Sequence, residues 1–316
     1  MPDAPIPPTG PSEFDLIRWL RGQVKECAAV PVGIGDDAAV VALAPGEHVV
    51  VTTDMVIDGV HFKGAEVGPF QVGHKAVARC LSDVAAMAAE PLAVVVAMAA
   101  PRNLTMAYFQ DLFRGLKAAA DACNARIVGG DISCAELPLT LTVTGLGSIP
   151  DGAALRRDGA RVGDMLMVTG DLGGSILGRH LTFLPRLKEA LWLRRSAALH
   201  GMIDISDGLA PDAGHLAEES RVGIELWEEA IPISRAARDL AERSGRTPLE
   251  HALYDGEDYE LLFTAASRDA TALLQRSDLP VKLSCIGEVV AGHGVSIRRK
   301  GEETRPLPPG GWVHTF

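Results

Sequence analysis

The sequence predicts an α/β protein of two domains that face a shared cleft. The chain has 316 residues, a length that favours two domains over one. In both halves an apolar strand is followed by a glycine turn that carries an acid, and then by a helix. A small polar segment over residues 148–152, with a proline and a glycine, separates the halves. We therefore expect domains over residues 12–148 and 152–316.

Composition narrows the possible partners. Hydrophobic residues make up 47% and charged residues 22% of the chain, as in ordinary soluble proteins. The net charge of −11 lacks the basic footprint of nucleic-acid binding, although metal ions could still bring phosphate ligands to acidic residues. Five cysteines without Cys-x-x-Cys spacing are typical of reduced thiols in a cytosol. We expect a cytoplasmic protein that binds no nucleic acid.

Neither the first residues nor the most apolar run of the chain predicts a membrane segment. Residues 1–11 are rich in proline and lack a basic, apolar start, so we expect a disordered tail rather than a signal peptide. Residues 84–100 are very apolar but are interrupted by Glu90 and Pro91. That interruption favours the end of a helix and a buried strand over a membrane span.

In the N-terminal domain, helices are predicted where apolar residues recur three and four positions apart, and strands where short apolar runs end in a turn. These rules give helices over residues 12–27, 74–89 and 107–124, and strands over residues 40–43, 49–53, 91–99, 127–128 and 139–146.

The C-terminal domain is predicted in the same way. Strands are expected over residues 165–169, 222–226, 261–264 and 285–290, and helices after Gly174 and over residues 209–220. Strand alternation from Met202 onward would place Asp204 and Ser206 on one side and Asp207 at the turn. The glycine turn over residues 170–175 is a weak candidate for an anion site, because it lacks the Gly-Lys-Ser/Thr ending of a Walker loop.

Acidic residues at glycine turns are the main functional signal. Gly33-Ile34-Gly35-Asp36-Asp37 places two carboxylates side by side, and Thr52-Thr53-Asp54 follows about fifteen residues later. Adjacent carboxylates repel, so a hard cation between their oxygens would stabilise the pattern. A polar surface turn would explain the first motif alone. The recurrence at Asp83, Asp131, Asp204 and Asp207 favours metal ligation.

Several of these residues keep a structural alternative. Asp83 could pair with Arg79, four residues earlier on the same helix. His61 lies near the acidic motifs, where a structural and a functional role are about equally supported. Arg157 could reach a phosphate or could be solvated surface. The acidic segment over residues 254–260 could be an exposed loop.

Six motifs, in order along the chain, match one family. The chain resembles the thiamine-monophosphate kinases, within the superfamily that includes aminoimidazole ribonucleotide synthetase and selenophosphate synthetase. The resemblance covers most of the chain, and Gly-Glu-Asp-Tyr-Glu favours the kinase over its relatives. The motifs are Gly33-Ile34-Gly35-Asp36-Asp37, Thr52-Thr53-Asp54, Leu81-Ser82-Asp83-Val84-Ala85-Ala86-Met87, Gly129-Gly130-Asp131, Ile203-Asp204-Ile205-Ser206-Asp207-Gly208 and Gly256-Glu257-Asp258-Tyr259-Glu260.

The resemblance implies a fold and a set of site residues. The fold would be an N-terminal α/β domain that dimerises through its sheet, beside a C-terminal α/β domain. The implied ligands of several magnesium ions are Asp37, Thr52, Thr53, Asp54, Asp83, Asp131, Asp204 and Asp207. The implied ATP contacts are Gly130, Asp131, Arg157 and Ser206, and the implied contacts to the thiamine substrate are His61, Glu257 and Trp312.

The resemblance also implies a reaction, which is direct in-line transfer of the terminal phosphoryl group of ATP to thiamine monophosphate. The substrate phosphate would be the nucleophile, and because it is already largely ionised near neutral pH we assign no general base. Glu257 could meet the cationic thiazolium or the pyrimidine, and Trp312 could stack on a ring.

The chain departs from the family pattern in two places, and two rival functions stand beside the kinase. The segment over residues 174–185 looks shorter than in many relatives, and Trp312 matches only as an aromatic residue near the end. One rival is another enzyme of the superfamily, acting on aminoimidazole precursors or selenide. The other is a non-catalytic regulator that binds a nucleotide or a divalent ion.

Overall fold

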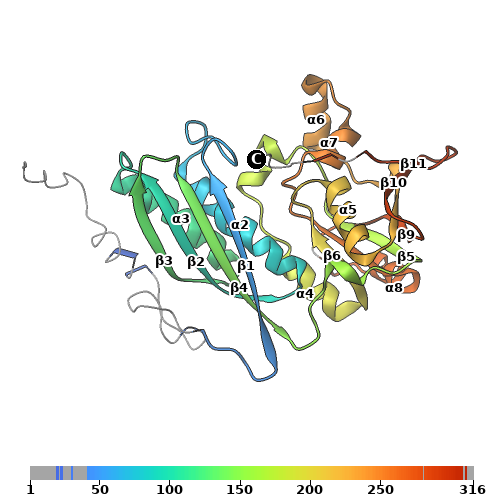
Figure 1. Cartoon of the computed structure of the whole chain (residues 1–316), viewed down its shortest axis with the longest axis horizontal. Helices are drawn as coiled ribbons and strands as arrows, with labels where there is room; N and C mark the ends of the chain where they lie inside the picture. The colour runs from blue at the N-terminus through green and yellow to red at the C-terminus, as the bar shows by residue number, and fades with distance from the viewer. Residues whose placement is uncertain are drawn as a thin grey trace, which may run out of the picture. The chain divides into compact units, whose positions relative to one another are not determined.

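The structure is a computed structural model that describes residues 19–20, 22–23, 30, 41–279, 281–308 and 310–311 (Figure 1). The chain forms two compact units. Unit 1 consists of residues 1–80 and 91–148, and unit 2 consists of residues 81–90 and 149–316. The predicted tail, the 33–37 turn and most of the predicted first helix lie outside the described residues.

Unit 1 is built on a four-stranded sheet in the order β1-β4-β2-β3. Its strands are β1 (Glu47–Ile57), β2 (Glu90–Pro101), β3 (Arg126–Ala135) and β4 (Thr140–Pro150). The predicted strand over residues 40–43 is wrong for its described part, because residues 41–44 belong to no strand. Glu47 N donates to Ala44 O at 3.2 Å across a turn that contains Pro45, and β1 begins only after it.

Helices α2 (Pro69–Ala86) and α3 (Met106–Ala122) cover one face of this sheet (Figure 1). Their backbones approach closely at two glycines: a Cβ on Gly73 would lie 2.2 Å from Leu112 O, and one on Gly115 would lie 1.9 Å from Phe70 O. Only glycine leaves room for this contact. Helix α2 begins five residues before the predicted start, with Pro69 at its first position, where a missing N–H costs little.

Unit 2 is built on a seven-stranded mixed sheet in the order β11-β10-β7-β9-β5-β8-β6. Helix α5 (Leu209–Ser220) packs on the sheet through Leu209, Ala213 and Leu216, which belong to the main apolar core of the unit. Helix α8 (Ser267–Leu274) contacts β5, β8 and β9. The strands are β5 (Asp164–Thr169), β6 (Leu199–Asp204), β7 (Gly223–Trp227), β8 (Leu261–Ala266), β9 (Leu283–Val290), β10 (Gly294–Arg298) and β11 (Arg305–Pro306).

The helix predicted after Gly174 does not form. The chain makes two short 3-10 turns, η2 (Ser175–Leu177) and η3 (Arg179–Leu181), before α4 (Leu187–Ser196) begins. Gly178, with φ 130°, lies between the turns and interrupts helical geometry. The remaining short elements are η1 (Arg157–Gly159), η4 (Glu228–Ala230), α6 (Arg235–Ser244) and α7 (Pro248–Tyr254).

Candidate active site

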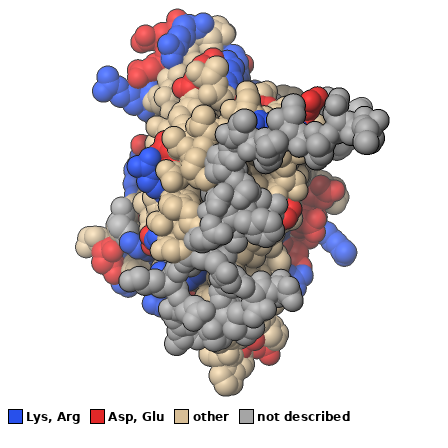
Figure 2. Space-filling model, turned by 90° about the vertical axis from the view of Figure 1, so that its left-hand side faces the viewer, with Lys and Arg blue, Asp and Glu red and all other residues tan. Residues whose placement is uncertain are grey.

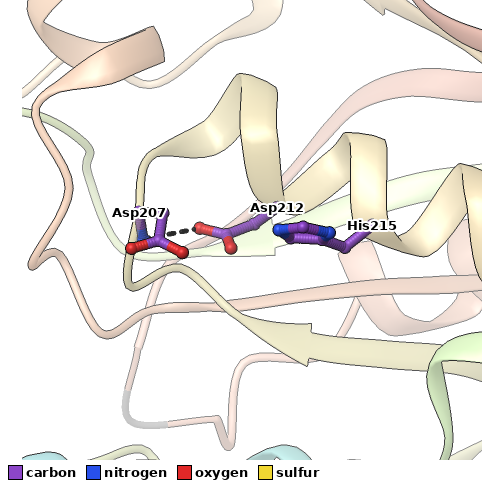
Figure 3. Close-up of side chains that lie close together, drawn as sticks. All are labelled: Asp207, Asp212 and His215. Atoms are coloured by element: carbon purple, nitrogen blue, oxygen red, sulfur yellow. Dashed lines mark hydrogen bonds between the residues drawn. The ribbon is translucent and has the colours of Figure 1, made fainter. Parts of the chain in front are cut away.

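The turn between β6 and α5 gathers acidic side chains in unit 2. Asp204 is the last residue of β6 and is buried, Asp207 lies in the turn, and Asp212 lies in the first turns of α5. The Asp212 carboxylate accepts from Asp207 N at 3.0 Å and from Gly208 N at 3.1 Å. One ligand atom each from Asp207, Asp212 and His215 lies within 4.8 Å of the others (Figure 3).

The negative charges of these carboxylates repel one another. Burial raises the pKa of Asp212 well above its usual range, and the negative charges of Asp204 and Asp207 raise it further. Carboxylate oxygens that repel in this way fit a hard cation such as Mg²⁺, which prefers oxygen ligands. The exposed His215 imidazole is a less suitable partner for that ion. The chemistry of the turn therefore fits magnesium through its carboxylates.

The end of α2 belongs to the same unit and meets this turn. Ser82 Oγ donates to Asp204 Oδ2 at 2.6 Å, and both side chains are buried. Asp83 is the next residue along α2 and is partly buried. The structure thus brings the Leu-Ser-Asp motif to the Asp204 end of β6, although the two are 122 positions apart in sequence.

The Gly256–Glu260 segment is bonded to the same turn. Glu257 N donates to Ser206 O at 2.7 Å, and Tyr259 N donates to Ile205 O at 2.7 Å. Glu257 and Tyr259 both have positive φ, 56° and 49°, which is strained for residues other than glycine. Strained backbone of this kind concentrates at functional sites.

The side chains of this segment are mostly inside the protein. Asp258 and Glu260 are buried, so the exposed-loop alternative for residues 254–260 is wrong. Burial raises the pKa of Asp258 to about 7; a hydrogen bond from Gly173 N and the charge of Arg179 oppose that rise, and Glu260 adds to it. Asp258 Oδ1 is buried without a hydrogen-bond partner, which is costly for an ionised group.

In the glycine turn before η2, two backbone N–H groups are not available to an anion. Gly173 N donates to Asp258 Oδ2 at 2.7 Å, and Gly174 N donates to Asp255 Oδ2 at 3.3 Å. The protein's own carboxylates occupy the positions that a phosphate would take. The predicted anion site in this turn is therefore wrong for these two donors.

Unit 1 carries the candidate ligands of β1. Exposure alternates along the strand, so Thr53 points to one face of the sheet while Thr52 and Asp54 point to the other. Thr53 Oγ1 lies 3.3 Å from Val143 O, and Asp54 Oδ1 lies 3.1 Å from Arg79 Nε. Arg79, considered above as a partner of Asp83, thus pairs with Asp54.

His61 and Gly130 each have a structural role in unit 1. His61 Nδ1 accepts from Ile57 N at 3.1 Å, so the ring proton of the neutral side chain lies on Nε2. A Cβ on Gly130 would lie 2.1 Å from Val96 O, so the packing of β3 on β2 alone requires a glycine there. The next residue, Asp131, is exposed on β3.

Comparisons with known proteins identify the family. Residues 35–149 match the N-terminal domain of AIR synthase related proteins, and residues 171–300 match the C-terminal domain. The chain is 40% identical over 309 residues to a thiamine-monophosphate kinase from Rhodopirellula baltica, covering 96% of this chain and 97% of that protein. It belongs to the thiamine-monophosphate kinase family.

Solved structures agree with this membership. A thiamine-monophosphate kinase from Stenotrophomonas maltophilia K279a superposes with a TM-score of 0.80 at 36% identity, covering 90% of this chain and 96% of that one. AaThiL complexed with AMPPCP and TMP superposes with a TM-score of 0.76 at 32% identity, covering 96% and 97%. The predicted fold class of two α/β domains is confirmed.

Within this thiamine-monophosphate kinase family member, the remaining predicted residues are placed as follows. Ser206 lies in the β6–α5 turn, beyond the end of β6, so the alternation predicted through it is wrong. Arg157 is exposed in η1, and its carbonyl accepts from Ser220 Oγ at 2.6 Å. Asp37 and Trp312 lie outside the described residues.

None of the described helices is long and apolar enough to cross a membrane.

Two residues of the site were missed by sequence reasoning. Asp212 and His215 lie on α5, where the neighbouring Leu209 and Leu216 are buried in the core. Asp212 lies three residues after Leu209 and four before Leu216, which places it on the buried face of the helix. This spacing could have identified Asp212 from the sequence, whereas no pattern in the sequence indicated the exposed His215.

Proposed function

We propose that this protein is a thiamine-phosphate kinase, which transfers the terminal phosphoryl group of ATP to thiamine monophosphate and releases thiamine diphosphate. The observation that carries the proposal is the acidic β6–α5 turn, in a chain that is 40% identical to a thiamine-monophosphate kinase over nearly its full length. The complex of AaThiL with AMPPCP and TMP supports ATP and thiamine monophosphate as the two substrates.

Asp204 and Asp207 are the proposed magnesium ligands of the β6–α5 turn, with Ser206 between them contacting ATP. Bound Mg²⁺ would neutralise phosphate charge during transfer. The pKa of Asp212, which burial and then the charges of Asp204 and Asp207 raise, supports these two ligands because it places their negative charges close together. The other proposed ligands are Asp37, Thr52, Thr53, Asp54, Asp83 and Asp131, and the other proposed ATP contacts are Gly130, Asp131 and Arg157.

The remaining residues of the site are proposed to bind rather than to react. The phosphate of thiamine monophosphate needs no strong base, because its second pKa is about 6. The Glu257 side chain is 24% exposed and can present its negative charge to the cationic thiazolium. His61 can donate a hydrogen bond from Nε2, and Trp312 is the proposed stacking residue.

We further propose that the protein is a homodimer formed through the sheet of unit 1. On β1 the apolar residues Val49, Val51 and Met55 are 50%, 59% and 45% exposed. They lie on the same side of the strand as Thr53. A row of exposed apolar side chains on a strand is typical of a protein interface.

We expect a cytoplasmic protein whose ligands are small molecules. The net charge is −11. On the described part of the face in Figure 2, Lys and Arg side chains stand singly or beside acidic ones. Nucleic-acid-binding proteins instead gather them into a basic stripe. The charge pattern of this face therefore gives no support for nucleic acid as a partner.

One assay tests the proposed function. The purified protein is incubated with ATP, thiamine monophosphate and Mg²⁺, and thiamine diphosphate is measured by chromatography. We expect product with Mg²⁺ and none in excess chelator. Product formation that is unchanged in chelator would overturn the metal assignment, and an absence of product with Mg²⁺ would overturn the kinase assignment.

A further inference from the structure

Two arginines hold the segment between η2 and α4 against the Gly256–Glu260 segment. Glu260 is buried, and its carboxylate accepts from Arg186 Nε at 2.7 Å and Nη2 at 2.6 Å. Arg179 Nη2 also donates to it, as does Thr169 Oγ1 at 2.6 Å. A buried carboxylate with this many charged donors fixes the position of the chain that carries them.

The anchored segment carries His180, which contacts the proposed substrate residue Glu257. His180 is buried, and its Nδ1 lies 2.9 Å from Glu257 Oε2. Tyr259 OH donates to the other oxygen, Oε1, at 3.5 Å. The Phe183 ring stacks on Tyr259 with centroids 4.1 Å apart and planes 6° apart (a parallel contact). Each Glu257 oxygen therefore lies beside a polar group that the anchored segment provides or supports.

We propose that His180 is a positioning residue, which holds the Glu257 carboxylate in the orientation that meets the cationic ring of thiamine monophosphate. This inference rests on the proposed function. The contact that carries this role is the 2.9 Å approach of His180 Nδ1 to Glu257 Oε2. A carboxylate that is already oriented loses less conformational freedom when the ligand binds, so its attraction to a cation is expressed as affinity. His180 thereby determines the KM for thiamine monophosphate and leaves the KM for ATP unaffected.

Three substitutions at position 180 separate this role from simple packing. His180→Leu removes this polar contact and should raise the KM for thiamine monophosphate about 2- to 12-fold, the effect of one ordinary polar interaction. The KM for ATP should change by less than about twofold, within ordinary context effects. His180→Asn places an amide N–H near the position of Nδ1 and should restore most of the affinity. His180→Gln places its amide near Nε2 instead and should resemble His180→Leu.

A matched control uses another histidine–carboxylate pair. His200 Nδ1 lies 2.8 Å from Asp164 Oδ2, at the opposite end of β5 from Thr169. His200→Leu should lower the melting temperature and leave both KM values unchanged. In a Glu257→Gln background, His180→Leu should no longer change the KM for thiamine monophosphate, because its effect passes through Glu257.

The outcomes are distinct. An unchanged KM for thiamine monophosphate in folded His180→Leu, or a KM change that persists in the Glu257→Gln background, overturns the role of His180 while the wild-type protein still makes thiamine diphosphate. Failure of the wild-type protein to make thiamine diphosphate overturns the proposed function itself, and the role of His180 with it.

Discussion

At the scale of single residues, the β6–α5 turn combines burial with repulsion among carboxylates. Burial and the negative charges of Asp204 and Asp207 raise the pKa of Asp212, and its carboxylate accepts hydrogen bonds from two backbone N–H groups at the start of α5. The same residue thus shapes the helix start and adds to the charge of the site. Substitutions that remove charge from this turn should therefore affect stability and activity in opposite directions.

Asp204→Asn separates these two effects. Asparagine can still accept the Ser82 hydroxyl, and it removes one negative charge from beside Asp207 and Asp212. The melting temperature of the metal-free protein should hold or rise, although a typical buried substitution destabilises by about 1 kcal/mol. Turnover should fall by about 10²–10³-fold, as for loss of one charge-stabilising group.

Melting curves with and without Mg-ATP, beside a turnover assay, measure both effects. A variant that melts early and yet turns over normally when folded would show that Asp204 has only a structural role.

Asp258→Asn should change how stability depends on pH. The pKa of Asp258 rises from 3.8, the ordinary value of an aspartate, to about 7 in the folded protein, so the folded state keeps a proton that the unfolded state releases. Between these values a rise in pH favours unfolding, and this destabilisation is complete above about pH 7. The stability of Asp258→Asn relative to wild type should therefore be more favourable at pH 8 than at pH 5.

Urea unfolding of both proteins at the two pH values checks this prediction. An identical free-energy difference at pH 5 and pH 8 would mean that Asp258 is ionised in the folded protein across this range.

At the scale of elements, local signals predicted most of the described strands and the helices α2, α3 and α5, whereas α4, α6, α7 and α8 were not predicted. Helix α5 begins and ends where it was predicted, since the glycine turn before it and the apolar spacing within it are local. The segment after Gly174 was predicted as a helix, but its arginines bond to Glu260, about 80 residues away. Spacing within the segment carries no information about that partner, and so neither His180 nor Phe183 could be assigned from the sequence.

Strand β1 carries the prediction at this scale. Val51→Lys places a charge on the exposed apolar row with Val49 and Met55 and should weaken the proposed dimer at least about tenfold, because burying an unpaired charge is costly. The melting temperature of the monomer should change little, since Val51 is exposed.

Sedimentation equilibrium measures the association. Leu274→Lys, at an exposed leucine on α8 in unit 2, is the matched control and should leave it unchanged. Equal association of Val51→Lys and wild type would remove β1 from the interface.

At the scale of the whole molecule, the six motifs predicted the family and the comparisons confirmed it. Motif order along the chain sufficed for this, because each motif is a short local run of residues that contains an acid. The sequence could not show that residues 81–90, the end of α2 and the turn after it, belong to the second compact unit. That assignment depends on tertiary contacts such as the hydrogen bond from Ser82 to Asp204.

The central claim is that this chain transfers a phosphoryl group to thiamine monophosphate rather than releasing it to water. The most direct test follows the label of γ-labelled ATP in the presence of Mg²⁺ and thiamine monophosphate, with Asp204→Asn as the inactive control. We predict that the label appears in thiamine diphosphate, with one ADP formed for each product molecule. Label found in inorganic phosphate, with thiamine monophosphate unchanged, would contradict the account and favour a different enzyme of the superfamily.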